Sequence, residues 1–495
     1  MIVLNRSIQE KLVFVPRYQP MRQNKQLAND KLGSGLKSKQ VTMISIGGVI
    51  GAGLFVGSSN AIAAAGPAVL VSYLIAAIIV VLVMQMLGEM ATARPDTGSF
   101  SSYADQAIGR WAGFSIGWLY WWFYVLVISI EAIVAGNILG DWLAIPHWMA
   151  AFGVTFALIA CNSLSVGNFG AMEYWLSLFK VCAIVSFIIL GVLAILGFLP
   201  GSSTSGMENL YVNGGFAPNG GVAIIAALLT AMFSFQGSEV VTIAAAESKE
   251  PKANIKKAIR AVVWRLGLFY LGSMFVVVCL IPWNAPGLAT GSYQAVLVAM
   301  NIPWAPGIMS IVVLVAVTSC LNSALYTASR MAYSLAHRGD APKILSRTTQ
   351  SGVPVNAIAL TAVVSLIALG ANYLLPKQVF EFLLATSGAI ALLMYLVIAV
   401  TQLCMRKKLV AQGQKLEVKM WLFPYLTVLT IAFILVVFGI MAAFPGQRIE
   451  LLSTLGLTVA LVCIGVYLQR SQPELSAKRS TMSQKGQAKI NRAFA

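Results

Sequence analysis

The chain has 495 residues, of which 58% are hydrophobic and only 10% are charged. Soluble domains carry roughly 25% charged residues, so this composition excludes an ordinary soluble enzyme. The Lys and Arg residues number 34 against 17 Asp and Glu, which gives a formal charge of +17. In a soluble protein such an excess would indicate nucleic-acid binding, and the placement of the charges decides whether it does so here.

A helix needs about 20 consecutive apolar residues to cross a bilayer. Twelve segments meet this requirement, so the sequence predicts an all-α integral membrane protein with twelve transmembrane helices. The expected segments are Val41–Ala65, Ala68–Met90, Trp111–Leu139, Trp148–Val166, Trp175–Phe198, Val222–Ala246, Val263–Trp283, Ile308–Leu335, Val355–Leu374, Val379–Met405, Trp421–Phe444 and Leu451–Leu468.

An even number of spans places both termini on the same side of the membrane. Of the 34 Lys and Arg residues, 31 fall in the tails and in the connections on that side, whereas only Lys377 and Arg448 fall on the other. Basic connections stay in the cytoplasm, so we expect both termini to be cytoplasmic. The positive charge is thereby explained by topology, and no nucleic-acid partner is expected.

The first span contains an interruption. Gly47, Gly48, Gly51 and Gly53 lie within seven positions in its middle. Each glycine inside a helix costs about 1 kcal/mol relative to alanine. Irregular backbone persists in the membrane only where it lines a cavity or is buried in protein, so we predict a broken helix. The alternative is that Gly47 and Gly51 form a close-packing surface between two intact helices.

The sixth span has a similar interruption, where Phe235 is followed by Gln236, Gly237, Ser238 and Glu239. Five spans separate the two interruptions, so a repeat of five helices would be inverted in the membrane. Interrupted helices at matching positions of two halves indicate a binding site near the midplane of the bilayer.

Such a pair of breaks suits a ligand that carries both charges. The N-terminus of a half-helix exposes free N–H groups, and we expect the amides from Ile50 to Leu54 to bind a carboxylate. The freed carbonyls of Phe235 and Gln236 can accept hydrogen bonds from an ammonium group. The candidate binding residues are Gly47, Gly48, Ile50, Gly51, Ala52, Gly53, Glu131, Phe235, Gln236, Gly237 and Ser323.

Ionisable residues inside spans are costly, and each is therefore a functional candidate. Glu131 in span three is expected to pair with a ligand ammonium or to take up a proton, and the alternative is a structural ion pair. Glu239 is expected to cap the lower half of span six, which is a structural role at a gate. Lys180 lies in span five, and the alternative to a functional role is a lysine that snorkels to the interface.

Span eight carries a polar face made of Ser319, Asn322, Ser323 and Tyr326. These positions are three, four and seven residues apart, which places them on one side of a helix. Two interpretations stay open, because the face either lines the pathway or hydrogen-bonds to span one. Asn322 is accordingly a gate or structural candidate.

Several motifs resemble one known family. The chain is similar to the amino-acid transporter branch of the amino acid–polyamine–organocation superfamily over roughly residues 33–470, and within it to bacterial γ-aminobutyrate (GABA) permeases. The motifs that carry the likeness are Gly51-Ala52-Gly53-Leu54-Phe55, Pro95-Asp96-Thr97-Gly98-Ser99-Phe100, Ala246-Glu247-Ser248, and the stretch from Ser319 to Met331. The likeness to GABA permeases lies in the stretches Gly109–Gly113, Trp118–Trp122 and Ser387–Leu393.

The resemblance implies a fold of two inverted five-helix repeats followed by two extra helices. The expected parts are a basic tail at 1–40, a twelve-helix domain at 41–470 and a second basic tail at 471–495. Within the domain, the repeats are expected at 41–198 and 222–405, and helices 11 and 12 at 421–468.

The resemblance also implies a proton-driven amino acid importer in the inner membrane, with Lys180 and Glu131 as proton-coupling candidates. The expected substrate is GABA or a close ω-amino acid, and the alternative is proline, an aromatic residue, alanine or glycine. No GxxxxGK[ST] phosphate loop is present for ATP, so transport is expected to be secondary. The six cysteines have no CxxC spacing and there are two histidines, so neither a metal nor a cofactor is expected.

Overall fold

The computed structural model describes residues 36–164, 166–199, 202, 206–374 and 376–471. In these ranges the regular structure is helical, and the only β-pairing is a single bridge between Leu36 and Ser248. Most of both predicted tails, including residues 1–32, lies outside the described residues.

The helices run through the chain in the following order. The α-helices are α2 (Ser38–Gly47), α3 (Ser58–Ala65), α4 (Val69–Ala93), α5 (Ser99–Ala107), α6 (Arg110–Leu143), α7 (His147–Leu164), α8 (Val166–Ile195), α9 (Gly220–Phe235), α10 (Val240–Ala246), α11 (Pro251–Arg265), α12 (Ser273–Leu280), α13 (Ser292–Ala299), α14 (Ala305–His337), α15 (Val355–Leu374), α16 (Pro376–Ala411), α17 (Tyr425–Ala443) and α18 (Pro445–Ser471). Two π-helices, η1 (Gly53–Gly57) and η4 (Leu266–Gly272), and four 3₁₀ turns, η2 (Gly66–Ala68), η3 (Glu208–Leu210), η5 (Pro286–Thr290) and η6 (Lys343–Ser346), join them.

Ten stretches among the described residues are long and apolar enough to cross a membrane, against the twelve segments predicted. The first predicted segment is not one helix, because a break follows α2; its second half is counted together with the next segment as Gly53–Ala93, although a turn at Gly66, with a φ of +63°, divides α3 from α4. The seventh predicted segment, Val263–Trp283, is divided between the end of α11, η4 and α12, and its apolar helix Gly267–Leu280 is short. The molecule is thus an all-helical membrane protein with several spans.

Both predicted interruptions are present. In the first span, α2 ends at Gly47 and η1 begins at Gly53, so the intervening chain is largely non-helical. In the sixth span, α9 ends at Phe235 and α10 begins at Val240. Gly237, between them, has a φ of +101°, a conformation that residues with a Cβ rarely adopt.

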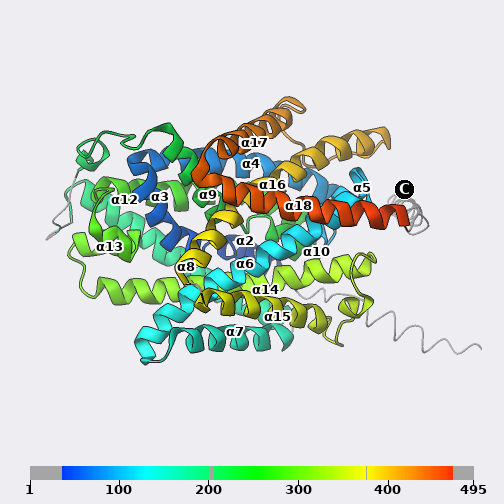
Figure 1. Cartoon of the computed structure of the whole chain (residues 1–495), viewed down its shortest axis with the longest axis horizontal. Coiled ribbons are helices and arrows are strands. Elements are labelled where there is room, and N and C mark those ends of the chain that lie inside the picture. Colours follow the sequence, from blue (N-terminus) through cyan, green and yellow to red (C-terminus); the bar gives the residue numbers. More distant parts are fainter. Residues whose placement is uncertain (1–35, 165, 200–201, 203–205, 375, 472–495) are drawn as a thin grey trace, which may run out of the picture.

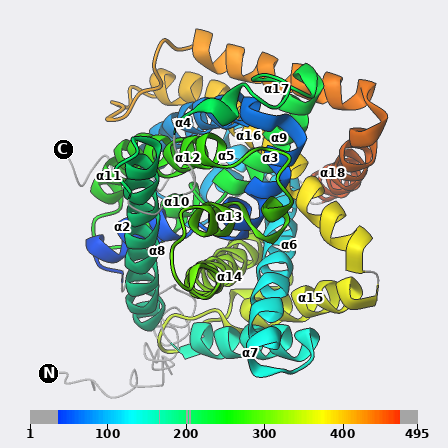
Figure 2. The same ribbon diagram turned by 90° about the vertical axis from the view of Figure 1, so that its left-hand side faces the viewer.

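The long helices lie side by side along one direction of the molecule (Figure 1). Helix α6 contacts α14, α7, α15, α16 and α18, so it lies near the middle of the bundle. Seen from one end, α7 and α15 lie on the flank opposite α17, and α8 lies on the flank opposite α18 (Figure 2). The residues of the two breaks, 48–52 and 236–239, are buried within the bundle.

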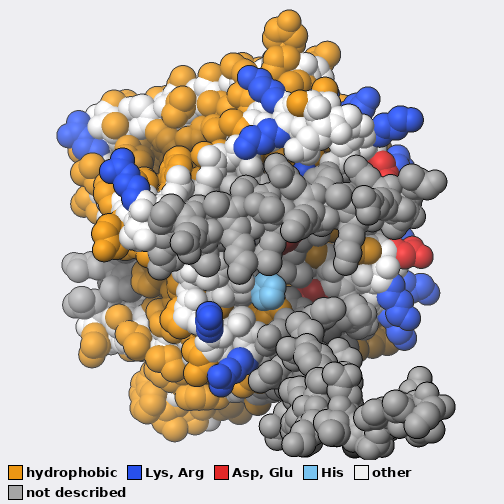
Figure 3. Space-filling view, turned by 90° about the vertical axis from the view of Figure 1, so that its right-hand side faces the viewer, with side chains coloured by type: hydrophobic (Ala, Val, Ile, Leu, Met, Phe, Trp, Pro, Cys, Tyr) orange, Lys and Arg blue, Asp and Glu red, His pale blue; other side chains and the backbone are white. Residues whose placement is uncertain are grey.

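The flanks of the bundle are apolar, as a surface in contact with lipid requires. Ile367, Val459, Leu452 and Trp175 are all more than 59% exposed although they lie in long helices. Figure 3 shows the end of the molecule where α18 ends, with Lys and Arg side chains around that face and apolar side chains on its flanks. Apolar side chains therefore lie both in the interior and on the outer surface of the bundle. For this reason hydropathy identifies the spans but not how they pack.

The connections predicted to share the side of the termini do meet at one end of the bundle. Arg110 forms an ion pair with Asp340 at 3.0 Å and also donates to the carbonyl of Leu468, at the end of α18. Arg406 forms an ion pair with Glu89 at 3.0 Å. We refer to this end of the molecule as the terminal end.

Candidate functional site at the two helix breaks

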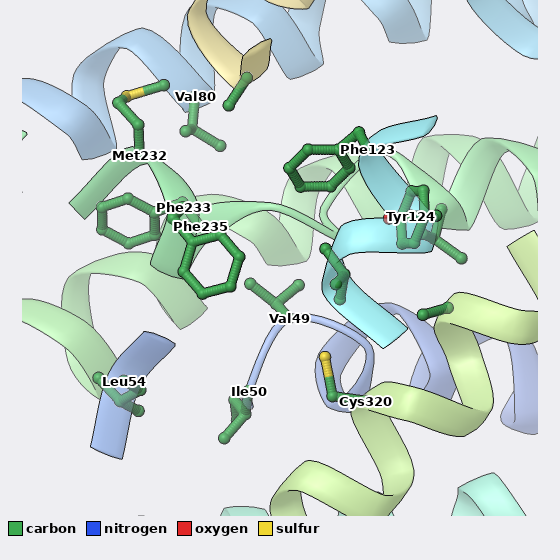
Figure 4. Close-up of a cluster of buried hydrophobic side chains, with 14 of the residues drawn as sticks. Val49, Ile50, Leu54, Val80, Phe123, Tyr124, Met232, Phe233, Phe235 and Cys320 are labelled. Atoms are coloured by element: carbon green, nitrogen blue, oxygen red, sulfur yellow. The ribbon is translucent and has the colours of Figure 1, made fainter. Parts of the chain in front are cut away.

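The two breaks contact each other through glycines. A Cβ on Gly237 would overlap the carbonyl of Gly48 and lie 3.3 Å from the Cα of Val49. A Cβ on Gly53 would lie 2.8 Å from the Cα of Ser234. Figure 4 shows the non-helical chain at Val49 and Ile50 passing close to Phe235, Phe123 and the sulfur of Cys320. Glycine is needed here because backbone packs directly on backbone.

A tyrosine hydroxyl links the carbonyls of the two spans. Tyr270 in η4 places its hydroxyl 2.8 Å from the carbonyl oxygen of Val49 and 2.8 Å from that of Ser234. A hydroxyl has one proton and donates to one of the two oxygens at a time. The break therefore contains carbonyl groups with spare capacity to accept a hydrogen bond.

Glu131 lies at the start of the second half of span one, the helix formed by η1 and α3. The backbone N–H of Ala52 donates to both carboxylate oxygens of Glu131, with N···O distances of 3.1 and 3.0 Å. Gly51 leaves room for this contact, because a Cβ there would overlap the Glu131 carboxylate and lie 2.8 Å from the sulfur of Cys320. Glu131 itself is 1% exposed.

This contact corrects part of the expected carboxylate site. Of the amides expected to be free between Ile50 and Leu54, that of Ala52 is bonded to Glu131, and that of Leu54 donates to the carbonyl of Gly51 at 3.2 Å. The cause is a side chain from α6 that folds against the break, which no local pattern around the glycines reveals.

Lys180 is bonded to the same break. Its Nζ donates to the carbonyl oxygen of Ile50 at 3.0 Å, and the side chain is fully buried. Helix α8 begins at Val166, nine residues before the predicted span, so Lys180 lies about four turns into the helix. A lysine that snorkels to the interface is therefore excluded.

Glu173 is a buried acid that the sequence reasoning missed. It lies two turns before Lys180 on α8, accepts a hydrogen bond from the Nδ2 of Asn322 at 3.2 Å, and is bonded to the hydroxyl of Ser319. The predicted span began at Trp175 and so left Glu173 in a connection. Its separation of seven residues from Lys180, which places both on one helix face, was the available signal.

The polar face of α14 contacts both Glu173 on α8 and the first-span break. Asn322 also accepts from the Nδ2 of Asn162 in α7 at 2.7 Å, so it joins α7, α8 and α14. Ser323 lies against the break, since a Cβ on Gly48 would lie 3.7 Å from its hydroxyl. The Ser323 hydroxyl is buried without a hydrogen-bond partner among the described residues. Of the two open interpretations of this face, Asn322 fits the structural one, and Ser323 faces the site.

Glu239 is held by aromatic residues. One carboxylate oxygen accepts hydrogen bonds from the hydroxyls of Tyr120 and Tyr124, each at 3.0 Å. The other accepts from the N–H of Gly237 at 3.2 Å. Glu239 is the N-cap residue of α10, but its side chain bonds to the break rather than to an amide of α10. It thus fastens the sixth-span break to α6.

A small cavity of about 20 Å³ lies between the breaks, lined by Gly48, Gly51, Glu131, Gln236 and Cys320 among others. That volume holds roughly one water molecule. Both polar atoms of the Gln236 side chain are buried without a hydrogen-bond partner among the described residues. Unsatisfied buried amides are costly, which indicates a group that meets a ligand or a water.

The remaining sixth-span candidates have partners. The Phe235 ring is fully buried, and its centroid lies 4.5 Å from that of Tyr270 and 5.8 Å from that of Tyr73. Its carbonyl accepts from the hydroxyl of Ser238 at 3.0 Å. At the first break, Gly47 is the last residue of α2, and the carbonyl of Gly48 accepts from Cys320 at 3.8 Å.

A second cavity, of about 660 Å³, reaches the surface at the end of the bundle opposite the terminal end. Exposed Asn137, His147 and Thr290 are among its lining residues, and Phe55 and Tyr293 lie at its inner part. Phe55 and Tyr293 are buried, with ring centroids 4.9 Å apart. Gly53, two residues before Phe55, lines the small cavity, so the first span borders both spaces.

The described residues include no group of three or more His, Cys, Asp or Glu side chains placed to hold a metal ion. The charged groups at the breaks are instead bonded to backbone, serine, asparagine and tyrosine groups. The arrangement supplies one lysine, three carboxylates, and unsatisfied amide and hydroxyl groups around the breaks in two helices, which suits binding of a small zwitterion rather than covalent chemistry.

Known proteins resemble this chain in sequence and in fold. A probable GABA permease of Pseudomonas aeruginosa is 56% identical over 90% of this chain and 95% of its own length. The γ-aminobutyric acid permease of Escherichia coli is 56% identical over 88% of this chain and 93% of its own length. The solved structure of a manganese transporter from Eremococcus coleocola matches with a TM-score of 0.56 at 13% identity, covering 93% of this chain and 97% of that one.

The structural match shows a LeuT-like transporter fold, and its low identity carries nothing about the transported species. The sequence model of the amino acid permease family matches residues 40–474, which is nearly the whole of the helical part. This chain belongs to the amino acid permease family.

Proposed function

We propose that the protein is a proton-coupled secondary transporter that imports GABA or a close ω-amino acid across the cytoplasmic membrane. The observation that carries this proposal is the 56% identity to two GABA permeases over about nine tenths of the chain. The second candidate is the same mechanism with another amino acid, such as proline, an aromatic residue, alanine or glycine. The shape of the closed site favours neither.

The proposed architecture is twelve spans in two inverted repeats, 41–198 and 222–405, with helices 11 and 12 at 421–468. It is supported by the two breaks, which lie in the first span of each repeat and contact each other. The termini are proposed to be cytoplasmic, because the basic connections gather at the terminal end. The cavity of about 660 Å³ would then face the outside of the cell.

The substrate is proposed to bind between the breaks. Its carboxylate would meet the amides at the start of the helix formed by η1 and α3, where the helix dipole favours negative charge. Its ammonium would meet the carbonyls beside Tyr270 and the side chains of Gln236 and Ser323. The cavity of about 20 Å³ is too small for an amino acid, so the structure represents a closed state. Binding would require spans one and six to move apart near Phe55 and Tyr293, the buried rings that line the larger cavity.

Lys180 and Glu131 are the proposed coupling residues. Each is bonded to the first break, through Ile50 and Ala52 respectively. A change in protonation at either residue therefore changes a contact of the moving helix. That link between a titrating group and a gate is what symport requires.

The test is uptake of radiolabelled GABA by proteoliposomes with an inwardly directed proton gradient, with competition by unlabelled amino acids. We expect accumulation that a proton ionophore abolishes, and competition by GABA and β-alanine well ahead of proline and phenylalanine. Protein-free liposomes are the control. Stronger competition by proline or phenylalanine would replace the substrate, and accumulation insensitive to the ionophore would remove the proton from the mechanism.

A further inference from the structure

We propose that the Glu131 carboxylate occupies, in the unloaded protein, the place that the carboxylate of the substrate takes in the loaded protein. Glu131 must then bind a proton and leave before the substrate can bind. This inference rests on the proposed function, and it names the step at which proton and substrate are coupled.

The geometry of Glu131 is that of a bound carboxylate ligand. Both of its oxygens lie within 3.1 Å of the Ala52 nitrogen. Ala52 immediately precedes the helix that runs through η1 and α3 to Ala65, so the carboxylate lies at the positive end of that helix dipole. This is the position expected for the carboxylate of an amino acid.

Independent observations show that the same space is arranged for a ligand. Gln236 lines the small cavity together with Glu131, and its amide oxygen and nitrogen have no hydrogen-bond partner among the described residues. The Ser323 hydroxyl, on the other side of Gly48, is also buried without a partner in the described part of the chain. A zwitterion whose carboxylate replaced that of Glu131 would lie within a space that already offers it polar groups.

Two carboxylates cannot share this position. The cavity holds roughly one water molecule, and Ala52 offers a single N–H. Two like charges at contact distance repel strongly in a buried site, so one of them takes a proton or leaves. The ionised form of Glu131 therefore excludes the substrate.

The charges around Glu131 explain why this residue takes the proton. Lys180 and Glu173, both on α8, attract each other electrostatically, and Glu173 is fixed by Ser319 and Asn322. Glu239 is fixed by Tyr120 and by Tyr124, which lies two turns before Glu131 on the same face of α6. Cys320 faces Glu131 from α14. Of these acids, Glu131 is the one bonded to an amide at the start of the half-helix, where the substrate is proposed to bind.

The sequence of events balances in charge. A proton from outside adds to the Glu131 carboxylate and gives a neutral carboxylic acid, which is a weaker acceptor for the Ala52 N–H. The side chain leaves, and the carboxylate of the substrate accepts that hydrogen bond. After the inner side opens and the substrate departs, Glu131 loses its proton to the cytoplasm and returns to Ala52. One proton crosses with each substrate molecule.

The test is calorimetric titration of the purified full-length protein with GABA and with 4-amino-1-butanol, which has a hydroxyl in place of the carboxylate. We expect the Kd for GABA to fall by about tenfold per pH unit on acidification while Glu131 is ionised, because one proton is bound with the ligand. The Kd for the amino alcohol should stay unchanged with pH, since it has no carboxylate to compete with Glu131.

The variant Glu131→Gln should bind GABA with a pH-independent Kd, whereas Glu250→Gln, at an exposed position, should keep the wild-type slope. An unchanged slope in Glu131→Gln, or an equal slope for the amino alcohol in the wild type, overturns the inference. The amino-alcohol arm needs no variant and holds even if Glu131→Gln does not fold. Proton-driven GABA accumulation without any pH dependence of Kd refutes this inference alone, whereas loss of proton-driven accumulation in the wild type refutes the proposed function.

Discussion

Lys180 has a bonding partner in the first-span break and two acidic residues that attract it. Its Nζ bonds to the carbonyl of Ile50, while Glu131 and Glu173 supply opposite charges that attract it. Burying a charge without compensation costs several kcal/mol, so the three residues depend on one another. Removing the lysine leaves two carboxylates without a cation.

We therefore expect Lys180→Met to abolish proton-driven accumulation of GABA, because the two carboxylates then hold a proton too firmly to release it. Exchange of labelled for unlabelled GABA across the membrane should persist at reduced rate, since it needs no net proton movement. Proteoliposome uptake and counterflow measure the two activities. Lys249→Met, at an exposed position, is the matched control. Proton-driven accumulation that is unchanged in Lys180→Met would remove Lys180 from the coupling.

At the same scale, hydropathy finds Lys180, Glu131 and Glu239 because each interrupts an apolar run. It does not find Glu173, because the predicted start of the span lay at Trp175, nine residues after the observed start of α8. Glu173, within this stretch, is bonded to Ser319 and Asn322 of α14. Those contacts are tertiary, and a window of sequence does not contain them.

At the scale of elements, the contact between the two breaks places a strict demand on Gly237. Its φ of +101° is disfavoured for other residues, and a Cβ would overlap the carbonyl group of Gly48. An added methyl group would have to displace backbone, because no flexible side chain is there to yield. The demand comes from the approach of the two spans and not from either span alone.

Gly237→Ala is expected to lower the free energy of unfolding by about 2 to 5 kcal/mol, from backbone strain and overpacking together. Thermal unfolding of the purified protein measures this, and GABA uptake should fall with it. Gly439→Ala in α17 is the matched control, since a Cβ there meets no atom within 4 Å. It should leave stability unchanged or raise it by less than about 1 kcal/mol. Equal effects of the two substitutions would show that the breaks do not pack as described.

At the scale of the whole molecule, the two ends differ. The cavity of about 660 Å³ reaches the surface at one end, whereas the terminal end contains buried ion pairs that include Glu247 with Arg330 at 3.2 Å. The guanidinium of Arg330 also lies 4.0 Å from the ring centroid of Tyr326, which stacks on Phe169. Burial raises the pKa of Glu247, and the charge of Arg330 lowers it by less. An acid whose pKa is raised in the closed state favours that state as the pH falls.

Arg330→Met should therefore open the terminal end at neutral and alkaline pH, because Glu247 is left as an unpaired buried carboxylate, and acidification should close it again. The readout is labelling of the buried Cys320 by a charged thiol reagent applied from the terminal side, quantified by mass spectrometry. The double variant Arg330→Met with Glu247→Gln removes both charges, so its labelling should be low at every pH. Labelling of Arg330→Met that rises on acidification would contradict this account.

The sequence by itself determined the helical membrane class, the positions of both breaks, the glycines within them and three of the buried charges. It could do so because lipid makes every polar or glycine-rich interruption costly, and such costs show in the local composition. Only the tertiary structure decided that Glu131 lies on the Ala52 amide, that Lys180 holds Ile50, and that Glu173 completes the group. These contacts join α6 and α8 to a break in the first span, and the pairing of helices distant in sequence leaves no trace in the hydropathy of any one of them.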